Sequence, residues 1–460
     1  MAFVYAPVLL FVSSTGFDLW EFTYTAASCI AGVIALSAAV VGYWLAPMGA
    51  VYRCLMAFAG IIGICTALSL AQRGARVRLI DRSAPGQETS FGNAGVISPW
   101  SIVPQSQPGL WRQIPRLMFG RYRPLSVRAA SWPKMLGWGT RYLRNGNQVK
   151  VQATSAAMEI LCGPSVDLYR KHLEGTGAEG LLADAMYIHA FRNPAGASLS
   201  SLSYAMRQER GAEIEVLGYH ALHRLEPALS PEFQAAVVIK GQARARNPGR
   251  IAEVLTQKAQ NLGVEVLHHE VHALSRTPEG WQITCQGAQL LADNVIVSMG
   301  VWSAELLRSL GYRFPLMAER GYHVEFPDPG LEMAHSVMDV DAACIASSME
   351  GGVRFAGQAE FAPIDAPVDP RRKAHLTRLA KAAFPALNTH NPRFWMGRRP
   401  SLPDGLPALG AMPQEKGLFV NFGHCHFGLM MAPKSGELLA DIVTQTPSNQ
   451  DLSAFSPARF

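Results

Sequence analysis

The chain has 460 residues, of which 49% are hydrophobic and 17% are charged, and its net charge is +6. A chain of this length folds into roughly two or three units with buried cores, and its apolar content excludes a disordered protein. Lysine and arginine are scattered rather than gathered into long basic runs, so we expect no nucleic acid partner. The seven cysteines include no Cys-x-x-Cys pair, which argues against a disulfide framework or zinc site and fits a reducing cytoplasm.

Residues 1–52 form an apolar N-terminal segment without a single Lys or Arg. Within it, Ala26 to Leu45 supplies the ~20 apolar positions that a transmembrane anchor needs. Acidic residues precede this stretch and arginines follow it, so the positive-inside rule would leave the rest of the chain cytoplasmic, attached to the inner face of the cell membrane. Two other interpretations stay open: a non-native start, caused by a wrong start site or a frame shift, and a buried helix.

The next segment predicts a strand, a glycine turn, a helix and a second strand. The first strand is expected at Cys54–Phe58, the helix at Ile64–Arg73, where Gly74 ends it, and the second strand at Arg76–Ile80. This order of elements is a βαβ unit, the building block of parallel sheets that bind dinucleotides.

The turn of this unit has the features of a dinucleotide-binding loop, with one exception. Gly60 lets the backbone approach a pyrophosphate, and Gly63 lets the helix pack closely on the strand. Asp81 stands 21 positions after Gly60, where a carboxylate accepts the ribose hydroxyls of an adenine dinucleotide. Phe58 replaces the first glycine, and a positive φ there would cost ~1–3 kcal/mol. We therefore predict a dinucleotide site whose loop is distorted or binds more weakly.

The middle of the chain predicts further helices and strands. A long helix is expected at Ser155–Glu174 and another at Asn247–Leu262, followed by a parallel strand at Gly263–Leu267. Before them, residues 101–145 mix aromatic and cationic side chains, as segments at a membrane interface do. Amphipathic helices that cover a domain have the same composition, so both interpretations stay open. The residues concerned are Trp111, Arg112, Arg116, Leu117, Met118, Arg121, Arg123, Trp132, Lys134, Trp138, Arg141 and Arg144.

Five short motifs carry a resemblance to a known family. They are Glu88–Ser98 (ETSFGNAGVIS), Val295–Ser303 (VIVSMGVWS), Ala318–His323 (AERGYH), Gly397–Gly405 (GRRPSLPDG) and Phe422–Leu429 (FGHCHFGL). In this order, the chain from residue 59 to about residue 443 resembles the D-amino-acid dehydrogenase branch of the D-amino-acid oxidase superfamily, which includes glycine oxidase and sarcosine oxidase. The first 58 residues match nothing in that family.

The resemblance implies an α/β fold, in which a Rossmann-like FAD-binding domain is interleaved with a mixed-sheet α+β substrate domain. We expect residues 53–150, 243–313 and 395–445 in the FAD-binding domain and residues 151–242 and 314–394 in the substrate domain. Residues 446–460 would form a C-terminal tail.

FAD is the cofactor that the resemblance implies. The backbone of a residue placed like Val271 meets the adenine in that family. Backbone amides of Gly428 to Met430, at the start of a helix continuing to Ile442, would stabilise negative charge on the N1 and O2 side of the reduced flavin. The residues that we expect to contact FAD are Ala59, Gly60, Ile61, Ile62, Gly63, Asp81, Arg82, Ser90, Asn93, Ala94, Gly95, Val271, Gly300, Trp302, Gly428, Leu429 and Met430.

Three side chains are candidates for the substrate pocket. Arg399 occupies the position at which the resembling family binds the substrate carboxylate, which a planar guanidinium fixes with two parallel charge-assisted hydrogen bonds. Tyr322 would share that carboxylate or close the pocket, and His426 would lie at the flavin edge or in the pocket. The alternatives are a structural ion pair, a core tyrosine and a structural histidine. His424 and His426 have no third ligand nearby, so we expect no metal.

The implied reaction is FAD-dependent oxidative deamination of a D-amino acid or D-imino acid by hydride transfer from the α-carbon to flavin N5. The electrons would pass to a respiratory quinone or another acceptor, and a quinone would favour membrane association. Two alternatives stay open: an oxygen-using glycine- or sarcosine-type amine oxidase, and an inactive homologue that holds little flavin because of Phe58.

Overall fold

A computed structural model describes residues 53–57 and 60–460. The expected span at residues 26–45, together with Phe58 and Ala59, lies outside the described residues. Across the part of the chain that is described, no helix combines the length and the hydropathy needed to cross a bilayer.

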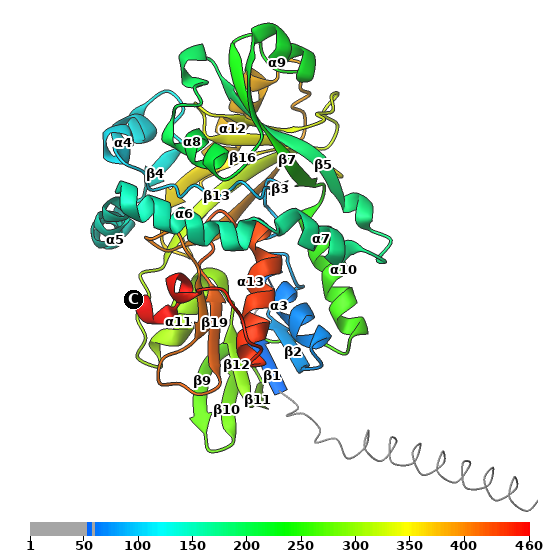
Figure 1. Ribbon diagram of the computed structural model, residues 1–460, viewed down its shortest axis with the longest axis vertical. Coiled ribbons are helices and arrows are strands. Elements are labelled where there is room, and N and C mark those ends of the chain that lie inside the picture. The colour runs from blue at the N-terminus through cyan, green and yellow to red at the C-terminus, as the bar shows by residue number, and fades with distance from the viewer. Residues whose placement is uncertain (1–52, 58–59) are drawn as a thin grey trace, which may run out of the picture. The chain divides into compact units, whose positions relative to one another are not determined.

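A six-stranded sheet carries the predicted βαβ unit (Figure 1). All neighbouring strands in it are parallel except the first pair. The predicted strand, helix and second strand are confirmed, although the helix α3 begins at Ile61 rather than Ile64. In sheet order the strands are β18 (Ala408–Ala411), β19 (Leu418–Phe422), β12 (Asn294–Val297), β1 (Arg53–Ala57), β2 (Arg76–Asp81) and β8 (Glu265–His268).

A ten-stranded mixed sheet lies above the first sheet in Figure 1. Most of its neighbours are antiparallel, but β14 pairs with β5 and β16 pairs with β4 in parallel. Its main path is β17 (Arg393–Ser401), β13 (Met317–Phe326), β16 (Gly352–Phe361), β15 (Cys344–Met349), β14 (Ser336–Asp339), β5 (Leu182–Phe191), β7 (Ala235–Ala245) and β3 (Val96–Ile97), with β4 (Leu125–Val127) and β6 (Ile214–Gly218) beside it.

The chain passes repeatedly between the two large sheets, which confirms the expected mixed α/β fold. A separate antiparallel sheet of β9 (Val271–Thr277), β10 (Gly280–Cys285) and β11 (Ala288–Ala292) follows β8. Strand β17 belongs to the ten-stranded sheet, so residues 395–401 pair with strands of the expected substrate domain. The domain limits themselves stay a prediction.

One helix prediction is wrong. In place of a single helix at Ser155–Glu174, α6 (Gln148–Cys162) and α7 (Ser165–Leu173) are separated at Gly163 and Pro164. Proline has no N–H and its ring clashes with the preceding turn, so it starts a new helix instead of continuing the first. The remaining helices are α4 (Leu110–Phe119), α5 (Trp132–Asn145), α8 (Leu202–Glu209), α9 (Tyr219–Leu225), α10 (Pro248–Asn261), α11 (Ser303–Arg308), α12 (Arg371–Ala383) and α13 (Gly428–Val443).

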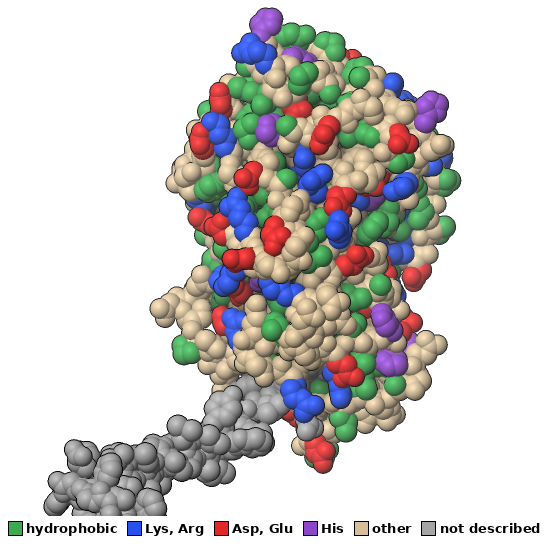
Figure 2. Space-filling model, turned by 90° about the vertical axis from the view of Figure 1, so that its right-hand side faces the viewer, with side chains coloured by type: hydrophobic (Ala, Val, Ile, Leu, Met, Phe, Trp, Pro, Cys, Tyr) green, Lys and Arg blue, Asp and Glu red, His purple; other side chains and the backbone are tan. Residues whose placement is uncertain are grey.

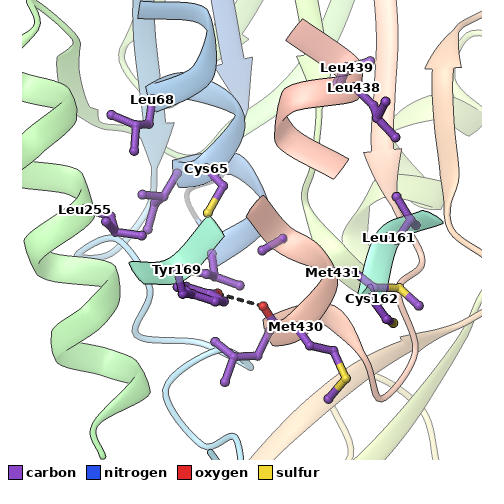
Figure 3. Packing of buried hydrophobic residues seen from close by; sticks show 14 of the residues in the cluster. Cys65, Leu68, Leu161, Cys162, Tyr169, Leu255, Met430, Met431, Leu438 and Leu439 are labelled. Carbon is purple, nitrogen blue, oxygen red and sulfur yellow. Dashed lines mark hydrogen bonds between the residues drawn. The ribbon is translucent and has the colours of Figure 1, made fainter. Parts of the chain in front are cut away.

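The core below the ten-stranded sheet is built around the contact between α3 and α13 (Figure 3). Gly436 on α13 faces the backbone of α3 so closely that a Cβ there would lie 2.7 Å from the carbonyl carbon of Cys65. Tyr169 on α7 closes the other side, and its hydroxyl donates a 2.7 Å hydrogen bond to the carbonyl oxygen of Leu429. Helix α13 is therefore held by α3 at its middle and by α7 at its first turn.

The surface face in Figure 2 intersperses Lys and Arg with Asp and Glu over its described residues. This distribution parallels the scattering of Lys and Arg along the sequence.

We predict that Gly436→Ala lowers the free energy of unfolding by ~1–3 kcal/mol, because the added methyl group forces two packed helices apart. Gly137→Ala is the matched control, since Gly137 is also helical but a Cβ there meets nothing within 4 Å. Urea denaturation of the two variants measures the difference. Equal losses in both variants would contradict the close α3–α13 contact.

Candidate active site

Within the described part of the chain, a cavity of about 1050 Å³ lies between the two large sheets. It opens at the carboxyl ends of the parallel strands β2, β12 and β19, the edge at which parallel α/β sheets bind their ligands. Its other wall is the face of the ten-stranded sheet. The volume is at the upper end of the ~300–1,000 Å³ typical of small-molecule pockets, so it suits a large cofactor with a substrate.

The N-terminus of α3 forms one end of this cavity. Gly60, Ile61 and Ile62 line it, and Gly60 is extended, with φ −66° and ψ 170°. The Ile61 amide donates a 3.0 Å hydrogen bond to Ser90 Oγ. The N-cap residue, Gly60, has no side chain to cap the helix, and the first turn contains no acidic residue. The positive end of the helix therefore faces the cavity without a competing carboxylate, as a pyrophosphate site requires.

Asp81 lies at the end of β2, buried and on the cavity wall. The backbone amide and hydroxyl of Ser83 donate to its Oδ1 at 3.0 and 3.2 Å. Arg82 turns away from the cavity, donates to Glu88 at 2.7 Å, and stacks its guanidinium 4.2 Å over the ring of Trp302. Asp81 thus lines the cavity, whereas Arg82 does not, and the contact of Asp81 with a ribose stays a prediction.

The N-terminus of α13 lines the middle of the cavity with Gly428, Leu429 and Met430. Beside it, His424 Nε2 is buried and has no hydrogen-bond partner among the described residues. Burial lowers the pKa of His424 to about 3, so its imidazole is neutral at physiological pH. A buried polar atom without a partner on a cavity wall is expected where a ligand supplies the partner. Together with the α3 end, this wall fits a dinucleotide cofactor.

Arg399 lies on the opposite wall, where β13 and β17 pair. Its Nη1 donates to Glu319 Oε1 at 3.0 Å and to the Gln358 carbonyl at 2.9 Å. Gln358 sits at a bulge between β13 and β16 and has φ 63°, which turns its carbonyl toward the arginine. The guanidinium lies directly over Gly321, because a Cβ there would be 2.2 Å from Nη2. The arginine is therefore held from three sides.

Glu319 is a buried carboxylate shared by three groups. Besides Arg399, Ser401 donates its hydroxyl at 2.9 Å, and His426 Nε2 lies 2.5 Å from Oε1. Burial alone would raise the pKa of Glu319, but contact with His426, then with Arg399 and Ser401, outweighs it and holds the pKa at about 2. Glu319 is therefore a permanent counter-charge rather than a proton acceptor.

Tyr322 lines the cavity, but its hydroxyl donates to the Glu360 carboxylate. Its ring stacks on Phe394 at 5.9 Å, and the Arg372 guanidinium lies 4.9 Å from it. Burial and the Glu360 carboxylate raise the pKa of Tyr322 to about 12. The phenol is thus a neutral part of the wall whose hydroxyl is already engaged.

The cavity brings together most of the residues expected from the sequence. Gly63 is buried within α3, and Val271 begins β9, so neither lines it. Gly95 also lies outside the lining and has φ 82°, with a hypothetical Cβ only 2.5 Å from the Ala245 carbonyl. The specific roles of all these residues stay predictions. Those on the cavity wall are Gly60, Ile61, Ile62, Asp81, Ser90, Asn93, Ala94, Gly300, Trp302, Tyr322, Arg399, His426, Gly428, Leu429 and Met430.

Sequence reasoning missed Glu319, although it stands in the quoted motif that contains Tyr322. Side chains alternate between the two faces of a strand, so a strand with Gly321 against a ligand side chain would also turn Glu319 to that face. The register then sets Glu319 directly opposite Arg399. That cross-strand pair is the signal that could have been used.

We predict that the stabilising effect of the Glu319 carboxylate depends on pH. Its folded pKa of about 2 lies below the ~4.3 of an unfolded glutamate, so the effect is complete above about pH 5 and is lost as pH falls toward 2. The pH-dependent part is on the order of 3 kcal/mol. Urea unfolding of the wild type and Glu319→Gln at stepped pH should show a constant difference above pH 5 that shrinks below it. If the stability difference between the wild type and Glu319→Gln grew on acidification, a lowered pKa for Glu319 would be contradicted.

Comparison with known proteins agrees with this geometry. The family described as FAD dependent oxidoreductase (DAO) matches residues 59–442. A D-amino-acid oxidase of Bradyrhizobium diazoefficiens is 31% identical over 410 residues, which cover 87% of this chain and 97% of that protein.

Solved structures share the fold. Glycine oxidase from Geobacillus kaustophilus has a TM-score of 0.68 at 22% identity, covering 89% of this chain and 99% of its own. L-Proline dehydrogenase from P. horikoshii has a TM-score of 0.68 at 16% identity, covering 89% and 97%. With the family matched over most of its length, the chain belongs to the DAO family of FAD-dependent oxidoreductases, whose cofactor the α3 and α13 ends of the cavity are built to hold.

Proposed function

We propose that this flavoenzyme oxidises a D-amino acid or D-imino acid at its α-carbon, with Arg399 binding the substrate carboxylate. The proposal rests on which nitrogens of the Arg399 guanidinium already donate hydrogen bonds within the chain. Among the described residues, only its Nη1 donates hydrogen bonds, so Nη2 and Nε are left for a ligand on the cavity side. A carboxylate bound to this edge is fixed in one plane. The D configuration is favoured by the relative from Bradyrhizobium diazoefficiens, a D-amino-acid oxidase.

The chain's own residues provide positioning rather than proton transfer. Bound FAD supplies the hydride acceptor. Glu319 stays ionised and keeps the Arg399 guanidinium in one orientation, so the α C–H is presented at a fixed angle. His424 is neutral and offers a hydrogen-bonding nitrogen to the cavity. No general base is needed when the substrate amine arrives uncharged, and water converts the released imine to a 2-oxo acid or leaves a cyclic imine.

We further propose that a membrane quinone is the electron acceptor and that the protein works at the inner face of the cell membrane. Helix α4 has no buried residue, and Trp111 and Phe119 on it are 60% and 74% exposed. Helix α5 adds the exposed Trp132 and Leu136, and residues of both helices line the cavity. Exposed aromatic residues beside arginines suit a lipid interface next to the cavity. Oxygen is the competing acceptor, as in glycine-oxidase-type enzymes.

We predict that Arg399→Ala raises KM for the best substrate by roughly 10- to 150-fold, because one or more charge-assisted hydrogen bonds of ~1.5–3 kcal/mol are lost. The substrate is first found with a panel of D- and L-amino acids and an artificial electron acceptor. Arg393→Ala is the control, since this arginine lies on the same strand but is exposed. An unchanged KM in Arg399→Ala would exclude the carboxylate role. Failure of FAD-loaded protein to oxidise any of the panel would overturn the proposed activity.

We predict that Trp111→Glu with Phe119→Glu lowers quinone reduction in anionic vesicles by roughly an order of magnitude, because each added negative charge at the surface costs ~1 kcal/mol. Activity with a water-soluble acceptor should stay unchanged. Leu291→Glu with Val368→Glu is the control, since both residues are exposed on other elements. Equal quinone activity in the two double variants would exclude this surface. Stoichiometric release of peroxide in air would favour the oxidase.

A further inference from the structure

A second polar cluster lies on the cavity wall away from Arg399. His189 and Tyr187 come from β5, while Tyr204 and Arg207 come from α8. His189 is only 8% exposed, and Tyr204 is buried as well. None of these side chains takes part in the contacts that hold Arg399.

The histidine of this cluster has one unsatisfied nitrogen. Its Nδ1 lies 2.7 Å from the Tyr204 hydroxyl, and the edge of the Tyr187 ring packs against it at 4.5 Å. Nε2 is buried and has no partner within the described part of the chain. Burial, and then Arg207, lower the pKa of His189 to about 3, so the ring is neutral. When the tyrosine donates to Nδ1, the ring proton sits on Nε2, which becomes a donor to the cavity.

Arg207 lies beside the histidine without a carboxylate. Its Nε donates to the Trp100 carbonyl at 2.9 Å and its Nη1 to the Ser203 carbonyl at 2.8 Å. It forms no ion pair with any described acidic residue. Burial lowers the pKa of Arg207, because removing the guanidinium from water makes its charged form less favourable. Arg207 is half-buried, and charges that are partly removed from water are normally paired, so an uncompensated cation on a cavity wall favours an anionic ligand.

Arg244 on β7 donates to the Met333 carbonyl, but two other arginines, one on β16 and one directly after β5, are paired with carboxylates. Arg354 lies 2.7 Å from Glu325, and Arg192 lies 2.7 Å from Asp339. In both cases the sheet itself supplies the carboxylate. At Arg207 the neighbouring groups are neutral tyrosines, a histidine and backbone carbonyls. The missing charge would therefore come from outside the chain.

We propose that Arg207, His189 and Tyr204 form a second anion subsite, which binds a carboxylate at the far end of the substrate. This inference rests on the proposed binding of the α-carboxylate at Arg399. Strand β5, which carries His189, and strand β17, which carries Arg399, are five steps apart in the sheet, or ~24 Å across it at ~4.8 Å per step. The favoured substrate is thus an amino acid whose extended side chain ends in a carboxylate, rather than a short one such as aspartate.

The test compares D-amino acids of increasing chain length that end in a carboxylate, such as 2-aminoadipate, 2-aminosuberate and longer homologues, with methyl-ended amino acids of equal length. We expect the wild type to prefer the carboxylate series by roughly tenfold or more in kcat/KM at the longer lengths, the value of one hydrogen bond between charged groups. Arg207→Gln should remove this preference and leave the methyl-ended series unchanged. Arg210→Gln on the same helix end is the control, because its side chain pairs with Glu159 outside the cavity.

Further measurements distinguish loss of the subsite from misfolding of a variant and from binding of a separate ligand. Tyr204→Phe keeps the ring and loses only the hydroxyl, so it should weaken the preference even if Arg207→Gln does not fold. Equilibrium binding of the diacids to FAD-loaded protein gives a readout that needs no turnover. If the protein oxidised amino acids but showed no preference for a terminal carboxylate at any length, the subsite would be excluded while the proposed activity would stand. The subsite would also be excluded if the preference survived in Arg207→Gln. A third contrary result would be that free adipate binds noncompetitively, together with a methyl-ended substrate.

Discussion

The close contact between α3 and α13 is the constraint on which the cofactor side of the molecule depends. Gly436 allows the two helices to approach backbone to backbone, although they are separated by most of the chain. Their first turns consequently face the same cavity. The positive ends of two helix dipoles are thus directed at one space, which suits an anionic cofactor. No side-chain cation is needed at the α3 end for this purpose.

The substrate side depends on a different device, a buried ion pair between neighbouring strands. Glu319 and Arg399 are directly opposite in the register of β13 and β17. A buried carboxylate and guanidinium would each be costly alone, but together they neutralise one another, and Ser401 and the Gln358 carbonyl satisfy further polar atoms. The pair therefore adds little net stability. Its value lies in holding a cation in a single orientation within an otherwise apolar wall.

Local sequence signals predicted the βαβ unit on the cofactor side of the cavity well. Glycine spacing and the acidic residue at position 81 were sufficient for the βαβ unit, because they report backbone requirements within thirty positions. The break at Pro164 should have been recognised by the same local rules. The hydroxyl contact of Tyr322 and the cluster at Arg207 were beyond reach. They depend on strand register and on which side chains face a shared cavity, and these properties arise only when distant segments pair.

The end of β17 is linked by hydrogen bonds to the loop after β19 and to the segment that contains Thr89. Ser401 bridges to His424, the Cys425 amide donates to the Pro400 carbonyl at 3.1 Å, and Thr89 donates its hydroxyl to the Arg398 carbonyl. A hinge motion that separated the two sheets would have to break all three contacts and displace the loop that carries His424. Hinge-type opening of the cavity is therefore opposed by hydrogen bonds within the chain itself, and the spacing between the cofactor-side and substrate-side walls is set by the fold.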